Sequence, residues 1–331
     1  MSEQNIIKWG IIGCGDVTEI KSGPAFNKVA NSQLIAVMRR DIEKAKDYAT
    51  RHQLPKFYGD AYELMQDPNI NAIYIATPPK FHEEYALAAM ERGKYVYVEK
   101  PVTLNVNACK RIIEAVEKHN AKLVVAHYRR ALPMFLHIKK LLQEEAIGKI
   151  KLINITLLQP GESNLIAQTK ENWRLNPEVS GGGLFYDLAP HQLDILIHLF
   201  GKALHCNGIS AHQSKLYPAE DAVCGNLLFE KDILFSGVWN FNAPAYLKEE
   251  KCKIIGEKGC IEFSFFGNEV ELIIEKHKER FSFQHPEHIQ QPMIEKTVSY
   301  FLDKEQNPCS IGVALHSLEV MENFVYKNCM K

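Results

Sequence analysis

The sequence predicts a doubly wound α/β domain with a parallel sheet, followed by an α+β domain with a largely antiparallel open sheet. The chain has 331 residues, which is too long for one ordinary small domain and suits two. Strand-like and helix-like segments alternate in its first part, whereas strand-like segments follow one another directly in the second. We expect the change near residues 127–131, which gives domains 1–127 and 128–331.

Short apolar runs rich in Ile, Val and Tyr predict the parallel strands of the first domain. They are Ile6–Ile12, Leu34–Met38, Ala72–Ala76, Tyr95–Val98 and Leu123–Ala126. Helical spacing predicts helices over Phe81–Arg92, before Gly93, and from Val106 to the vicinity of His119.

In the second part, helices are expected at Leu132–Glu145 and Ala189–Phe200, with a strand at Ile150–Leu158 between them. Further strands with tight turns predict the antiparallel sheet. They are His205–His212, Ala222–Phe229, Ile233–Phe241, Lys251–Ile255, Cys260–Phe265 and Val270–Glu275. Two helices, Pro292–Asp303 and Gly312–Tyr326, complete the prediction.

Composition excludes several classes of protein. Lys and Arg number 39 against 40 Asp and Glu, a balance that disfavours binding to nucleic acid or to an anionic membrane. No apolar run approaches the roughly 20 residues of a membrane span. The first residues lack the basic segment of an export signal, so we expect a cytoplasmic protein. None of the eight cysteines forms a Cys-x-x-Cys pair, which favours reduced thiols and no bound metal.

A glycine-rich loop follows the first predicted strand. Gly13 and Gly15 occupy the first two positions of a G-x-G-x-x-G/A pattern, and Thr18 departs from it at the third. Such a loop lets a pyrophosphate approach the backbone at the start of the next helix. We therefore expect a dinucleotide at Gly13, Gly15, Asp16 and Val17.

The second predicted strand ends in Arg39, Arg40 and Asp41. NAD-binding folds normally carry an acid here for the ribose 2′-hydroxyl, whereas guanidinium groups suit a 2′-phosphate. The pattern favours NADP(H) over NAD(H), with Arg39 and Arg40 as ligands. Two alternatives stay open: both arginines are merely solvated, or Asp41 reaches the ribose.

Two later strands end at the same ligand-binding edge of the sheet. Ala76, Thr77 and Pro78 follow one of them, with His82 close behind, and are candidates for cofactor contacts. His82 is equally compatible with a local role at a helix start. Glu99 and Lys100 follow the other strand, and Pro101 restricts Lys100 to an extended conformation. A lysine fixed beside a nicotinamide can stabilise negative charge on a reacting hydroxyl, although an ordinary surface lysine is the alternative.

In the second domain, Asp187 and His191 lie at i, i+4 spacing. Asp187 is a plausible helix N-cap and Pro190 suits only a first turn, so we expect the helix to start there. A carboxylate on the same side can orient the imidazole, which suits general acid–base catalysis near neutral pH. Purely structural roles for both residues are the alternative.

These motifs together resemble the glucose–fructose oxidoreductase / inositol dehydrogenase / rhizopine-catabolism (Gfo/Idh/MocA) family of NAD(P)-dependent oxidoreductases. The resemblance rests on the glycine loop, Ala76-Thr77-Pro78, Glu99-Lys100-Pro101 and Asp187-x-x-x-His191, and it covers the whole chain. It implies a Rossmann domain and a hydride transfer to or from a sugar, cyclitol or related polyol. It further implies that Lys100 and His191 are catalytic with support from Asp187, that Glu99 and Lys100 lie at the cofactor, and that the second sheet provides both a substrate pocket and an oligomer contact, in a homodimer or homotetramer.

Tyr128 and Arg129 at the domain junction, and Trp173 and Arg174 before the triple glycine, are weaker substrate candidates. An aromatic ring and a guanidinium suit a sugar, but core packing and salt bridges explain them equally well. Three rival functions remain: a metal enzyme using His191, Asp194 and His198, a dinucleotide-sensing regulator without turnover, and an NAD-dependent glycosidase.

Overall fold

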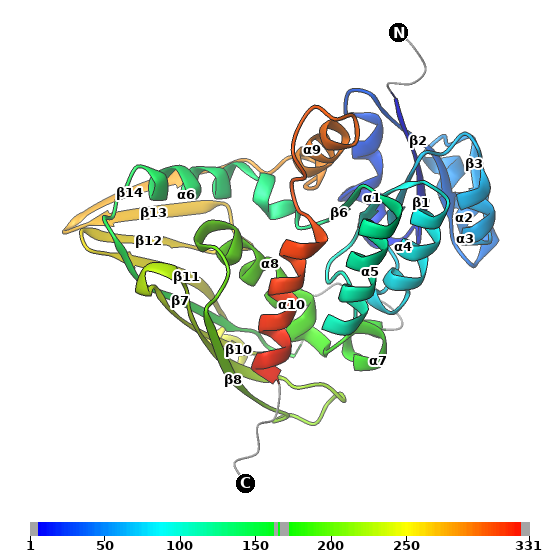
Figure 1. Ribbon diagram of the computed structural model, residues 1–331. Coiled ribbons are helices and arrows are strands. Elements are labelled where there is room, and N and C mark those ends of the chain that lie inside the picture. Colours follow the sequence, from blue (N-terminus) through cyan, green and yellow to red (C-terminus); the bar gives the residue numbers. More distant parts are fainter. Residues whose placement is uncertain (1–5, 162–164, 166–171, 326–331) are drawn as a thin grey trace. The chain divides into compact units, whose positions relative to one another are not determined.

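The computed structural model describes residues 6–161, 165 and 172–325 (Figure 1). The chain forms two compact units: residues 1–129 with 286–315, and residues 130–285 with the segment from His316 onward. The sequence analysis assigned everything after residue 127 to the second domain. The structure differs because the segment 286–315 returns to the first unit. The predicted helix end at Tyr326 lies outside the described residues.

The first unit contains a six-stranded sheet in the order β3-β2-β1-β4-β5-β6, and every neighbouring pair is parallel. Its strands are β1 (Ile7–Ile12), β2 (Ser32–Met38), β3 (Lys56–Tyr58), β4 (Ala72–Ile75), β5 (Tyr95–Val98) and β6 (Leu123–Val125). This order confirms the doubly wound α/β domain. Strand β3 was not predicted, because it has only three residues, two half-buried and one exposed, which give no clear period-2 signal.

Helices connect these strands and cap the sheet. They are α1 (Asp16–Ile20), α2 (Ile42–Arg51), α3 (Ala61–Gln66), α4 (His82–Glu91) and α5 (Val106–His119). Helix α9 (Gln291–Phe301) joins them from the returning segment. Its Phe301 ring packs 5.7 Å from Trp9 and 4.9 Å from Tyr95, measured between centroids. This buried aromatic contact explains why the segment belongs to the first unit.

The second unit contains an eight-stranded sheet in the order β14-β13-β12-β11-β7-β10-β9-β8. Only β7 and β10 are parallel, which confirms a largely antiparallel sheet. The strands are β7 (Ile150–Leu158), β8 (His205–Ala211), β9 (Ala222–Leu228), β10 (Leu234–Asn240), β11 (Glu249–Gly256), β12 (Gly259–Phe263), β13 (Glu269–Ile274) and β14 (His277–Ser282). Strand β14 was not predicted, because its residues are mostly polar and exposed.

Helices α6 (Pro133–Gln143), α7 (Pro177–Ser180), α8 (Gly183–Phe200) and α10 (Ile311–Val325) are the other helices seen in Figure 1. On one face of the sheet, α6 packs through Phe135 onto Phe263 and Phe265. Phe324 of α10 lies over β9, where a Cβ on Gly225 would come within 2.3 Å of its ring. The side chains of β9, β10 and β11 on the opposite face are half-buried or exposed, and polar and apolar residues alternate there; we call this the open sheet face.

Candidate active site

The glycine loop joins β1 to α1 in the first unit. Gly13 has φ +92°, and a Cβ there would come within 2.8 Å of the Thr77 side chain, so only glycine fits. Gly15 is different, because the nearest atom to its missing Cβ is a carbonyl oxygen 4.0 Å away. The loop is therefore packed on one side and leaves room at Gly15. This arrangement fits the close approach of a pyrophosphate group.

Thr18, the departure from the glycine pattern, closes the same loop. Its buried hydroxyl accepts a hydrogen bond from the Gly15 N–H at 2.9 Å and donates one to the Gly15 carbonyl at 2.8 Å. The Tyr48 hydroxyl donates to the Thr18 carbonyl at 2.7 Å. The branched side chain thus serves as a cap for the five-residue helix α1.

Two exposed arginines, Arg39 and Arg40, follow β2, and Asp41 comes next as the cap of α2. Nη1 of Arg39 donates to the Cys14 carbonyl in the glycine loop at 3.2 Å, and Arg40 lies 5.3 Å from the Phe81 ring centroid. Asp41 caps α2 by accepting the Lys44 N–H at 3.3 Å, and its carboxylate lies 2.9 Å from Lys44 Nζ. The hydrogen bonds from Lys44 lower the pKa of Asp41. Asp41 is therefore occupied as a helix cap, whereas Arg39 contacts the glycine loop and Arg40 lies against Phe81.

His82 joins the two loops that follow β4 and β5. Its ring is fully buried, with Nε2 2.7 Å from the Thr77 carbonyl oxygen and Nδ1 3.0 Å from the Pro101 carbonyl oxygen. Desolvation by burial lowers the pKa of His82. Both ring nitrogens thus face backbone carbonyl oxygens, and a neutral imidazole donates a hydrogen bond to one of them. These contacts fit the local role that the sequence analysis gave as an alternative, and a contact between His82 and the cofactor stays a prediction.

Glu99, directly before Lys100, is a buried carboxylate. Its Oε1 accepts hydrogen bonds from the Tyr74 hydroxyl at 2.6 Å and from Nε2 of Gln290 at 2.7 Å. Its Oε2 accepts the Lys100 N–H at 3.2 Å, and the Lys100–Pro101 peptide is cis. Sequence reasoning missed Tyr74 and Gln290. Tyr74 is one more apolar strand residue in the sequence, and no local pattern connects Gln290 with Glu99.

In the second unit, α8 begins earlier than predicted. Its N-cap is Gly182, so Asp187 is not a cap and Pro190 lies inside the helix. The reason is the triple glycine: Gly181 and Gly183 have φ +95° and +69°, which lets the chain turn into the helix before Asp187. Asp187 is instead 3.4 Å from Arg174, between Oδ2 and Nε.

Trp173, Arg174 and Asp187 form one cluster. The guanidinium carbon of Arg174 lies 4.5 Å from the Trp173 ring centroid. Arg174 is only 8% exposed, and its Nη1 is buried without a hydrogen-bond partner in the part of the chain that the structure describes. Arginine is always charged and can only donate. A donor of this kind is suited to a ligand oxygen.

His191 is buried on α8, and the ring of Phe266 meets it edge-on with centroids 5.9 Å apart. Phe266 belongs to the turn between β12 and β13. Glu250 holds this turn by accepting the backbone N–H groups of Phe265 at 2.9 Å and Phe266 at 3.3 Å. Sequence reasoning missed Phe266 because a turn phenylalanine carries no chemical signal.

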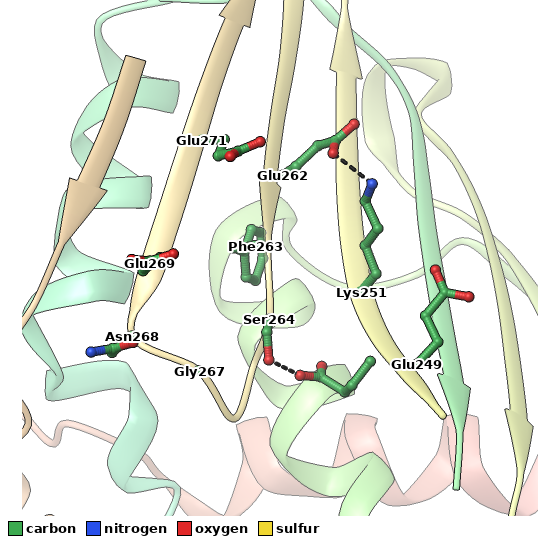
Figure 2. Close-up of a pocket in the computed structure, with 10 residues that line it drawn as sticks. Glu249, Lys251, Glu262, Phe263, Ser264, Gly267, Asn268, Glu269 and Glu271 are labelled. Atoms are coloured by element: carbon green, nitrogen blue, oxygen red, sulfur yellow. Dashed lines mark hydrogen bonds and ion pairs between the residues drawn. The ribbon is translucent and has the colours of Figure 1, made fainter. Parts of the chain in front are cut away.

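A hollow in the same sheet is lined by Glu249, Glu250, Lys251, Glu262, Phe263, Ser264, Gly267, Asn268, Glu269 and Glu271 (Figure 2). Lys251 and Glu262 form an ion pair at 2.6 Å, and Ser264 contacts Glu250. None of the site residues predicted from the sequence is in this lining.

Tyr128 and Arg129 are buried in the first unit, with the Arg129 guanidinium 5.4 Å from the Tyr128 ring centroid.

In the second unit, Arg130 binds both oxygens of Asp194 at 2.8 and 2.6 Å. Because this buried ion pair occupies Asp194, the metal set of His191, Asp194 and His198 loses its carboxylate. Among the described residues, no group of three or more His, Cys, Asp or Glu side chains is arranged to hold a metal ion. None of the described helices is long and apolar enough to cross a membrane.

A parallel sheet with a glycine loop at its first turn is the architecture of a dinucleotide-binding domain, and here a second unit built on a largely antiparallel sheet accompanies it. The protein-family model "Oxidoreductase family, NAD-binding Rossmann fold" matches residues 7–127. The family model of the GFO/IDH/MocA C-terminal domain matches residues 135–262. The chain belongs to the GFO/IDH/MocA family, as the resemblance of its motifs indicated.

Individual relatives agree with this assignment. The chain is 46% identical to Oxidoreductase P35 of Formosa agariphila over 96% of its own length and 98% of that protein. It is 32% identical to trans-1,2-dihydrobenzene-1,2-diol dehydrogenase of Xenopus laevis over 58% of its length and 56% of that protein. A levoglucosan dehydrogenase solved with NADH and levoglucosan has a TM-score of 0.84 at 20% identity, covering 96% of each chain, which shows a common fold.

Proposed function

We propose that this oxidoreductase transfers a hydride between a nicotinamide dinucleotide and a carbinol or carbonyl carbon of a sugar, cyclitol or related polyol. The observation that carries the proposal is the position of the Lys100 backbone directly after β5. The Lys100 N–H donates to the Glu99 carboxylate, which the Tyr74 hydroxyl holds in turn. Parallel sheets bind ligands at the carboxyl ends of their strands. The names of the dihydrodiol and levoglucosan dehydrogenases support a polyhydroxy substrate.

Each catalytic residue has a distinct task in this proposal. The bound dinucleotide supplies or accepts the hydride. The Lys100 ammonium donates a hydrogen bond to the substrate oxygen and stabilises the negative charge that develops there. His191 removes the hydroxyl proton during oxidation and returns it during reduction. Asp187 supports His191 from one helical turn away, while its ion pair with Arg174 limits its movement.

Substrate orientation is assigned to Arg174 and Trp173, with Tyr128 and Arg129 as further contacts. The buried Nη1 of Arg174 is a donor for a hydroxyl, ether or carbonyl oxygen of the substrate. Because Asp187 already balances the guanidinium charge, a neutral substrate suits this position better than a sugar acid.

The cofactor proposal is NADP(H) in preference to NAD(H). It is supported by the two guanidinium groups after β2 and by the engagement of Asp41 as a helix cap. The loop residues Gly13, Gly15, Asp16 and Val17 would hold the pyrophosphate, with Ala76, Thr77 and Pro78 beside them.

We also propose a homodimer or homotetramer that uses the open sheet face. On this face Ile209 of β8 and Val238 of β10 are in register through Cys224 of β9, and they are 74% and 38% exposed. Adjacent exposed apolar residues are typical of interaction surfaces. Sedimentation velocity of the wild type and Ile209→Asp tests this proposal, and a wild-type monomer would contradict it.

A spectrophotometric panel at 340 nm tests the activity itself. Both oxidised and both reduced dinucleotides are offered with polyols, cyclitols, anhydro-sugars and dihydrodiols. Turnover with at least one compound, lost in Lys100→Met, supports the dehydrogenase. Binding of a dinucleotide without turnover would favour a sensing regulator. Glycoside cleavage without net NADPH or NADH production would favour the glycosidase.

A further inference from the structure

A chain of buried hydrogen bonds runs from Lys100 to Gln290 within the first unit. It begins at the Lys100 N–H, which donates to Oε2 of Glu99 at 3.2 Å. The other oxygen of Glu99 accepts from Nε2 of Gln290 at 2.7 Å, and Gln290 is 1% exposed. Gln290 comes from the returning segment, immediately before α9. A residue far away in sequence therefore holds the carboxylate next to the proposed catalytic lysine.

The orientation of the Gln290 amide is fixed from its other side. The Tyr97 hydroxyl donates to Oε1 of Gln290 at 3.1 Å, so the amide nitrogen is the atom that faces Glu99. The Gln290 backbone is held too, because its N–H donates to the Lys21 carbonyl at 3.1 Å. Gln290 thus offers Glu99 a donor that can neither rotate nor withdraw easily.

Glu99 depends on these donors. A buried carboxylate is costly unless hydrogen bonds replace its water, and bonds to charged acceptors are the strong ones. Oε1 has two side-chain donors, Gln290 and Tyr74. Burial and the nearby Glu99 charge raise the pKa of Tyr74, so its hydroxyl keeps its proton. We expect the loss of either donor to weaken the hold on Oε1 and let the carboxylate turn, which would shift the hydrogen bond between Oε2 and the Lys100 N–H.

We infer that Gln290 is a positioning residue that acts on catalysis through Glu99 and Lys100. The inference rests on the proposed function, in which Lys100 assists hydride transfer. Gln290 does not need to touch substrate or cofactor. Its task is to keep the Lys100 backbone in the position from which the ammonium reaches the substrate oxygen. Small displacements of a catalytic group can lower turnover by about 100-fold.

The test compares Gln290→Met with Gln291→Ala. Methionine keeps the volume and removes the donor and acceptor. Gln291 is the control residue, because within the described part of the chain its side chain donates to exposed Glu295 at 3.2 Å and not to Glu99. We expect Gln290→Met to lower kcat by roughly 10- to 100-fold, with KM and the cofactor Kd within about threefold. The primary deuterium isotope effect on kcat should rise, while Gln291→Ala resembles the wild type.

A double variant separates positioning from general damage. If Gln290 acts only through Lys100, Gln290→Met should cause no further loss in the Lys100→Met background. A full additional loss there, or an unchanged kcat in Gln290→Met alone, would overturn the inference. If Gln290→Met does not fold, Tyr74→Phe takes its place, since it removes one hydroxyl from the same oxygen of Glu99. A fully active Lys100→Met would overturn the proposed function instead.

Discussion

Nε of Arg174 lies 3.4 Å from Oδ2 of Asp187, while the same guanidinium is stacked 4.5 Å from the Trp173 ring centroid. The carboxylate one helical turn before His191 is therefore held by a residue outside α8. Arg174 contributes to the site in two ways: it restrains Asp187, and it retains a buried donor on Nη1. The two contributions can be separated by mutation.

Arg174→Lys keeps the charge beside Asp187 but removes the planar fork and the Nη1 donor. We expect KM for the substrate to rise about tenfold, which corresponds to roughly one hydrogen bond, with a smaller change in kcat. Steady-state kinetics measure both constants. An unchanged KM would show that Nη1 does not bind the substrate.

His191→Ala should lower turnover by roughly 10²- to 10⁴-fold, the usual contribution of a general acid–base group. The cofactor Kd should be unchanged, because the imidazole belongs to the second unit. Single-turnover measurements and cofactor titration provide the two values. Near-wild-type turnover would remove His191 from the mechanism. Phe266→Leu, which alters the ring packed against His191, is expected to have the smaller effect.

Lys100→Met removes the ammonium with little change in length. If the ammonium stabilises charge mainly in the transition state, kcat and kcat/KM should fall together. The measurement is a full saturation curve at saturating cofactor. A loss confined to a raised KM would instead identify Lys100 as a residue that binds ground and transition states equally.

The wild type should bind NADP(H) about ten- to a hundredfold more tightly than NAD(H), because charge-assisted bonds from Arg39 and Arg40 outweigh the desolvation of the 2′-phosphate. Isothermal titration with both oxidised cofactors measures the ratio, and Arg39→Asp should reverse or abolish it. Lys44→Ala releases Asp41 from its ion pair, and therefore tests whether Asp41 can reach the ribose and shift the ratio towards NAD(H). Tighter binding of NAD by the wild type contradicts the assignment.

Stability should decrease in mild acid because of His198. Desolvation, with smaller contributions from Arg130 and Lys139, lowers the pKa of His198 to about 4. An unfolded histidine titrates near 6.5, so between these pH values the unfolded chain binds more protons than the folded one. The free energy of unfolding should therefore fall as pH decreases from about 6.5 to about 4.

Urea unfolding across this pH range tests the His198 prediction. His198→Gln should flatten the slope, whereas the same substitution at exposed His205 should leave it unchanged. Equal slopes in the wild type and His198→Gln would contradict the assignment.

Periodicity predicted the elements whose side chains alternate or repeat clearly. The predicted limits of Tyr95–Val98 and Ile150–Leu158 match β5 and β7. It failed at β14, where Phe281 is the only apolar residue. It also failed at the start of α8, where Gly182 is the N-cap and its neighbours Gly181 and Gly183 have positive φ. Local patterns describe a residue's own segment. They were enough to nominate Arg39 and Lys100 as candidate site residues, because each directly follows a predicted strand.

Contacts between distant segments were beyond the reach of such patterns. The sequence distance between Glu99 and Gln290, or between Phe266 and His191, is bridged only by tertiary packing. The same applies to Asp187, whose residue type suggested a cap while its partner Arg174 lies before the triple glycine. Glu99, His191 and Asp187 were thus nominated from sequence motifs, but the residues that contact them could be identified only in the folded structure.

The return of residues 286–315 to the first unit has a consequence for how the protein is made. Domains emerging from the ribosome generally fold in order, the N-terminal one first. Here a nascent chain that has reached residue 129 still lacks α9 and Gln290, so Trp9 has no Phe301 to cover it and Glu99 lacks a donor. The nucleotide-binding unit is thus completed only after the whole large sheet of the second unit has been synthesised. An expression clone that stops at residue 129 should yield an aggregation-prone fragment, and co-expression of the remaining chain should restore it.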